Sequence, residues 1–65
     1  MRIDTVLFDR NNRRDCSIMD KLVLFLVLRA YRFEVCQHNC SAAITRITVY
    51  GWEEDDDIKE TAKRL

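Results

Sequence analysis

The chain has 65 residues, 48% of them hydrophobic and 34% charged, and its eleven basic residues balance its eleven acidic ones to a net charge of zero. This balance excludes a strongly basic nucleic-acid-binding arm and a wholly acidic tail. Proline is absent and glycine occurs once, which excludes a linker or a low-complexity segment and predicts one small globular domain over residues 1–65.

The N-terminal segment predicts a β-strand followed by a polar loop. Residues 2–8 alternate between two faces and are rich in β-branched side chains, with Ile3, Thr5 and Leu7 pointing the same way. Residues 9–15 (DRNNRRD) are polar and contain asparagine, as is typical of a loop between regular elements.

A helix is predicted to begin at Ser17, whose hydroxyl can accept a hydrogen bond from a free first-turn amide, with Asp20 near its positive end. Apolar residues then recur from Ile18 with helical spacing. Residues 22–28 are apolar on every side, so a buried strand is the alternative for this segment, although the capping signal and the leucine content favour a helix. This run of seven residues is far shorter than the about 20 that cross a membrane.

The second half predicts two strands and a helix. Residues 31–36 alternate as a half-buried strand, residues 37–41 (QHNCS) form a turn, and residues 43–50 (AITRITVY) are the most regular strand. Gly51 ends that strand, and residues 53–65 predict an amphipathic helix. Two pairs at helical i, i+4 spacing support this last helix: Asp55 with Lys59, and Glu60 with Arg64.

These elements predict an α+β fold in the order β-α-β-β-α, with a three-stranded, mostly antiparallel sheet and two helices on one face. The second and third strands form a hairpin, and the first reaches its neighbour through a helical crossover. A chain of this size buries only about 60% of its unfolded surface, so it needs very regular packing, a partner or a staple.

Four residues offer the types of side chain that a structural zinc site would need. Cys36, His38 and Cys40 fall within five residues, and Cys16 completes a Cys3His set. Their spacing is tighter than the about two to four residues usual between zinc ligands. The alternative is that Cys16 and Cys36 pack in the core as small apolar residues and that His38 lies in solvent. In that case the protein binds no cofactor. The odd number of cysteines argues against a disulfide framework and favours the cytoplasm.

Catalysis is not expected from this sequence. A Cys–His pair can form a nucleophile, but it needs a cleft and an oxyanion site, for which a chain this short offers little material. No phosphate-binding loop, nucleophile elbow or metalloprotease helix occurs. We therefore expect a protein that is not an enzyme.

Two charged segments are the candidate partner-binding residues. The acidic segment consists of Trp52, Glu53, Glu54, Asp55, Asp56 and Asp57, and the basic segment contains Arg10, Arg13 and Arg14. The acidic residues have three interpretations: they bind a basic partner, they mimic nucleic-acid phosphates, or they complement the positive N-terminal end of the last helix. The third interpretation also explains the basic residues at the C-terminal end of that helix. Trp52 either anchors a partner or closes the core. Nucleic acid is not expected on the arginines, because aspartates bracket them and no aromatic residues separate them.

Net charge hides an asymmetry between the two halves of the chain. Residues 1–32 carry seven basic and four acidic side chains, and residues 33–65 carry four and seven, which gives +3 and −3. We therefore expect a small non-enzymatic protein that binds another protein as an inhibitor or adaptor, in the style of phage proteins that target host enzymes. The alternatives are a zinc-stabilised domain and an acidic nucleic-acid mimic. The surplus of apolar residues also predicts a homodimer, packed through Ile44, Tyr50, Tyr31 and Phe33.

Overall fold

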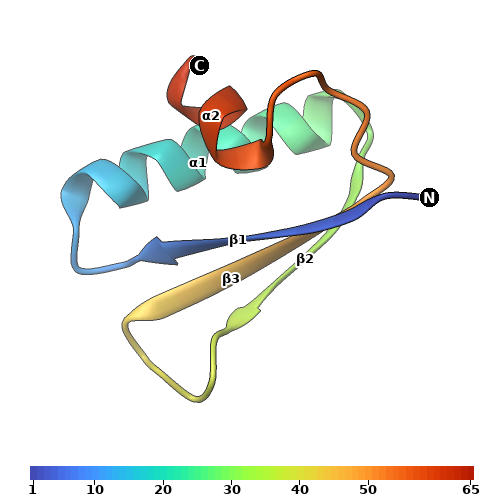
Figure 1. Ribbon diagram of the computed structural model, residues 1–65. Helices are drawn as coiled ribbons and strands as arrows, with labels where there is room; N and C mark the ends of the chain where they lie inside the picture. The colour runs from blue at the N-terminus through green and yellow to red at the C-terminus, as the bar shows by residue number, and fades with distance from the viewer.

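The computed structural model describes residues 1–65 and contains three strands and two helices. In chain order these are β1 (Ile3–Asp9), α1 (Arg13–Leu28), β2 (Arg32–Gln37), β3 (Ile44–Tyr50) and α2 (Ile58–Lys63). The strands form one sheet in the order β1-β3-β2, and both outer strands run antiparallel to β3. Both helices lie on the same face of the sheet, and the other face is open (Figure 1). The predicted fold class and element order are confirmed.

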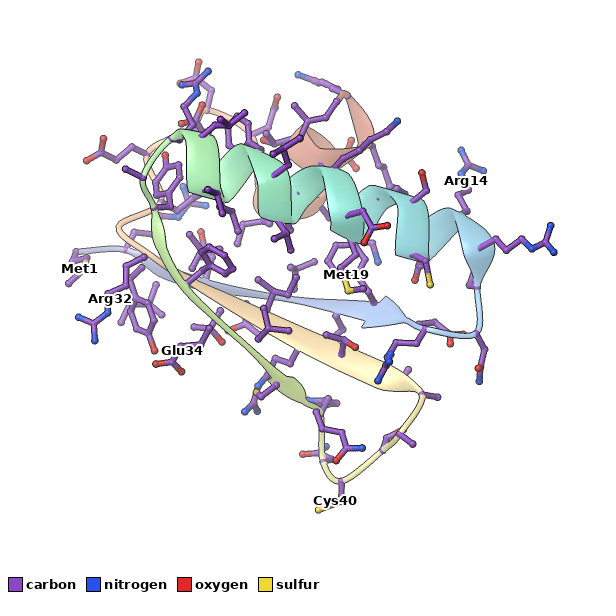
Figure 2. All side chains as sticks on the ribbon, turned by 180° about the vertical axis from the view of Figure 1, so that it is seen from behind. Met1, Arg14, Met19, Arg32, Glu34 and Cys40 are labelled. Carbon is purple, nitrogen blue, oxygen red and sulfur yellow. The ribbon has the colours of Figure 1, made fainter.

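The core lies between this sheet and the helices. Because strand side chains alternate, Thr45, Ile47 and Val49 of β3 face the helices and are buried, whereas the residues between them face outward and are half-exposed. Met19 of α1 fills the space between helix and sheet (Figure 2). The buried apolar side chains are Val6, Phe8, Leu22, Leu26, Ile47, Val49, Trp52, Ile58 and Ala62.

Helix α1 begins at Arg13, so the predicted start at Ser17 is wrong. Asn12 is the N-cap, because its side-chain oxygen accepts a hydrogen bond from the backbone N–H of Asp15 at 3.1 Å. The Asp15 carboxylate in turn accepts from the backbone N–H of Asp9 at 2.9 Å, which ties the helix to the end of β1. Asparagine caps as well as serine does, and this second bond selects the earlier start.

Residues 22–28 are helical, which excludes the buried-strand alternative. Leu22 and Leu26, one turn apart, are completely buried, so this side of α1 faces the sheet. The helix ends where the backbone N–H of Arg29 donates to the carbonyl of Phe25, and Ala30 follows with a φ of 57°. Neither helix has the length and apolar character needed to span a membrane.

Helix α2 is much shorter than the predicted helix over residues 53–65. It begins at Ile58, with Asp57 as its N-cap accepting from the backbone N–H of Glu60 at 2.9 Å. Residues 52–57 are not helical, because the buried Trp52 ring holds them in a loop: its Nε1–H donates to the carbonyl of Asp56 at 2.9 Å.

The two predicted ion pairs of the last helix are absent as a result. Asp55 lies outside the helix, and Glu60 pairs with Lys63 at 3.6 Å rather than with Arg64. Lys59 instead donates to the carbonyl of Leu7 at 3.2 Å. This contact places α2 beside the outer edge of β1, the edge that does not pair with β3. The outer edge of β2 has no such cover.

Candidate interaction surface

The four predicted zinc ligands do not come together. Cys16 lies in the first turns of α1, where its thiol donates to the carbonyl of Arg10 at 3.2 Å. Cys36 lies on the open face of the sheet, where Arg46 donates to its sulfur at 3.1 Å. Because α1 packs on the opposite face, the sheet separates these two thiols.

His38 and Cys40 belong to the loop between β2 and β3, and Cys40 lies at the tip of this loop, far from α1 (Figure 2). No three histidine, cysteine, aspartate or glutamate side chains form a group that could hold a metal ion. All three cysteines are free thiols.

Trp52 belongs to the core rather than to a partner-binding surface. It is only 2% exposed, and its ring stacks on Tyr31 at 5.4 Å and lies against Phe25 at 6.2 Å between ring centroids. Burial raises the pKa of the Tyr31 hydroxyl above 10.0, and its 2.7 Å hydrogen bond to Glu54 raises it further. This aromatic cluster fixes the start of the acidic segment against the end of α1.

Three of the five acids are engaged within the fold. Glu54 accepts from Tyr31 and lies 4.0 Å from the guanidinium of Arg29. Asp57 caps α2, and Asp56 pairs with Arg64. The acids with exposed side chains and no such contact are Glu53 and Asp55.

The basic segment is freely available to solvent. Arg10, Arg13 and Arg14 are exposed, and none of the ion pairs in the molecule includes them. The bracketing Asp9 and Asp15 instead bind backbone N–H groups of the same loop. Arg14 points away from the body of the protein at the N-terminal end of α1 (Figure 2).

The two charged segments do not touch, because they lie at opposite ends of α1. The basic segment leads into the first turn of the helix, whereas the acidic segment is bound beside its last turn through Arg29 and Tyr31. A helix of 16 residues is about 24 Å long. The basic and acidic segments are therefore separated in space, although Arg29 and Arg32 of the basic half lie beside the acidic segment.

An exposed apolar stripe along the outer side of α1 was not among the predicted site residues. Leu24, Val27 and Leu28 are 60%, 58% and 75% exposed, and their spacing places them on one face of the helix. Leu65 lies beside them and is 44% exposed. We refer to Leu24, Val27, Leu28 and Leu65 as the outer stripe. The signal in the sequence was the all-round apolar character of residues 22–28, only one side of which can face the sheet.

A shallow hollow of about 290 Å³ lies within the outer stripe. Its lining consists of Lys21, Leu24, Phe25, Leu28 and Leu65. Leu65 also borders a second hollow, whose other lining residues are Glu54, Asp55, Asp56, Thr61 and Arg64, so the apolar surface is continuous with the acidic segment. Lys21 marks the opposite limit of the apolar surface, toward the basic end of α1.

The four residues predicted to form a dimer surface do not share one face. Phe33 and Tyr31 pack against the core, whereas Ile44 and Tyr50 lie on the open face of the sheet. The alternation of strand side chains separates them, since Phe33 pairs with the buried Val49. The open face itself is mixed: Arg32 and Glu34 of β2 lie on it (Figure 2), together with the exposed Ile3 and Leu7 of β1.

No protein-family model, curated protein or solved structure matches this chain. Among its surfaces, the outer stripe combines exposed apolar side chains with charges of opposite sign at its two ends.

Proposed function

We propose that the chain is a non-enzymatic protein-interaction domain of the inhibitor or adaptor type, and that the outer stripe binds the partner protein. The observation that carries this proposal is the exposure of Leu24 and Leu28, at 60% and 75%, around a continuous apolar hollow. Contiguous apolar patches on a small protein mark surfaces that another molecule covers. The free cysteines fit a reducing compartment, so we propose a cytoplasmic location.

The energetics assign separate roles to the apolar and charged residues. Each aliphatic side chain of the stripe, already partly buried, would contribute about 1–2 kcal/mol when covered. Association costs at least about 4 kcal/mol in lost freedom, so the stripe alone supports only weak binding. Charged groups at the rim add orientation and a faster association rate. Glu53, Asp55 and the exposed arginines are available for this role.

Nucleic-acid mimicry by the acidic segment has less support. A phosphate mimic presents a row of free negative charges to its partner, but Glu54, Asp56 and Asp57 are bound within the fold. We therefore assign the free acids to the rim of a protein interface.

The test is affinity capture from the native host with three baits. The wild-type chain is compared with Leu24→Asp, which places a charge in the stripe, and with Ile3→Asp, a matched control on the open face of the sheet, where Ile3 is 56% exposed. We expect a partner that the wild type and Ile3→Asp retain and Leu24→Asp loses. The purified partner should then bind Leu24→Asp at least about tenfold more weakly than the wild type. Equal recovery on all three baits would contradict the proposal.

A further inference from the structure

We propose that a second copy of this chain occupies the outer stripe, in a two-fold symmetric dimer whose α1 helices pack antiparallel. The inference rests on the proposed function in one respect, because it takes the outer stripe to be a protein-binding surface. It goes further by naming an occupant and an arrangement, and a partner protein that binds the outer stripe must then compete with the second copy.

A two-fold interface must be complementary to itself. The centre of the outer stripe meets this condition, since antiparallel helices place Leu24 of one copy against Leu28 of the other, and symmetry repeats the contact. The hollow beside these residues, lined also by Phe25 and Leu65, is open to receive the side chain from the facing helix. The interface thus contains two equivalent apolar contacts, each between Leu24 of one copy and Leu28 of the other.

The same pairing brings opposite charges together. Lys21 precedes Leu24 by three residues, and Tyr31 follows Leu28 by three residues. Setting Leu24 against Leu28 of the second copy therefore brings Lys21 to the C-terminal end of that copy's α1, beside which Tyr31 binds Glu54 at 2.7 Å. Lys21 has no ion pair within its own chain.

The charge separation along α1 selects the antiparallel arrangement. A parallel pair would set basic end against basic end and acidic end against acidic end, which repel. In the antiparallel pair, Lys21 of each copy faces the acidic segment of the other, where the negative charges of Glu53, Glu54 and Asp55 outnumber the one positive charge of Arg29 beside them. The chain thus carries both halves of a complementary interface on one helix and the loop beside it.

Sedimentation equilibrium under reducing conditions tests the interface, with the reductant preventing disulfides between the free cysteines. We expect a dimer whose dissociation constant rises at least about tenfold for Leu24→Asp. Ile3→Asp should leave it unchanged, and circular dichroism should show that both variants are folded. A strictly monomeric wild type at high micromolar concentration would overturn the proposal. So would a dimer that Ile3→Asp disrupts and Leu24→Asp does not.

A charge exchange tests the antiparallel orientation. Lys21→Glu alone and the double variant Glu53→Lys with Asp55→Lys alone should each dimerise at least about tenfold more weakly, because each homodimer then sets like charges together. Their mixture should form a heterodimer close to wild-type affinity, since both contacts are again attractive. Failure of the mixture to associate would overturn the arrangement.

The two proposals fail in different ways. A monomeric chain that still captures a host protein through Leu24 would refute the dimer and leave the proposed function standing. A dimer with the expected charge dependence that captures no other protein would support the inference and refute the inhibitor or adaptor role.

Discussion

Replacing Trp52 by phenylalanine tests whether this residue holds the acidic segment in place or serves a partner. The indole is 2% exposed, stacks on Tyr31, and donates its N–H to the carbonyl of Asp56 at 2.9 Å. Phenylalanine keeps an aromatic ring in this cluster, but it lacks the N–H donor of the indole. Its smaller ring also leaves part of the space that the indole occupies unfilled.

The expected loss can be worked out from these contacts. Losing one hydrogen bond costs about 1 kcal/mol. The smaller ring forfeits about another 1 kcal/mol in packing, a fraction of the about 3–5 kcal/mol of a change from tryptophan to alanine. A domain of this size has a net stability of only roughly 3–5 kcal/mol, so a total loss of about 2 kcal/mol removes close to half of it. The melting temperature should fall by roughly 8–16 °C.

Thermal and urea unfolding followed by far-ultraviolet circular dichroism measure this change, since the variant lacks the only tryptophan for fluorescence. Arg14→Ala, at an exposed residue without an ion pair, is the control and should stay within about 0.5 kcal/mol of the wild type. A Trp52→Phe protein as stable as the wild type would refute the structural role of Trp52.

Three further predictions concern the acidic segment, Tyr31 and the predicted metal ligands. Asp57→Ala should lower the free energy of unfolding by about 1 kcal/mol in urea titrations, because it removes the α2 cap, whereas Asp55→Ala should not; equal effects would contradict the assigned cap. Because the pKa of Tyr31 is raised in the folded state, its contribution to stability is complete below pH 10.0 and is lost as the pH rises toward the folded pKa. Tyr31→Phe should flatten that alkaline decline in melting temperature, and an unchanged slope would show that another group causes it. Chelation with EDTA should leave the melting temperature of protein purified without added zinc unchanged, since the four predicted ligands are dispersed; a marked fall would reveal a metal that the fold requires.

The strands were predictable because one face of the sheet is buried. Alternation along residues 44–50 places Ile47 and Val49 in the core, and a shift by one residue would expose both. The helix ends were predicted less well, because they depend on contacts outside the helix. Asn12 and Asp15 define the start of α1 through a bond to β1, and the buried Trp52 keeps the acids out of α2.

The candidate site depends on the same tertiary contacts. The observed α2 spans only Ile58–Lys63 in place of the predicted residues 53–65, and Leu24 and Leu28 lie in solvent. The charge asymmetry was visible in the sequence. The distance between the basic and acidic segments, however, depends on where α1 begins and ends, and the sequence did not predict those residues. The dispersal of the cysteines likewise depends on which face of the sheet the helix covers.

The central position of β3 constrains the order in which the chain folds. Both of its neighbours precede it in the sequence, so no strand pair exists until residues 44–50 have been synthesised. The β2–β3 hairpin closes over the short loop of residues 38–43, whereas β1 must wait for a strand that lies beyond α1 and β2. Contacts between distant segments form more slowly than local ones. On the ribosome, the apolar residues of β1 therefore remain without a strand partner until the last third of the chain emerges, and the hairpin serves as the template to which β1 is added.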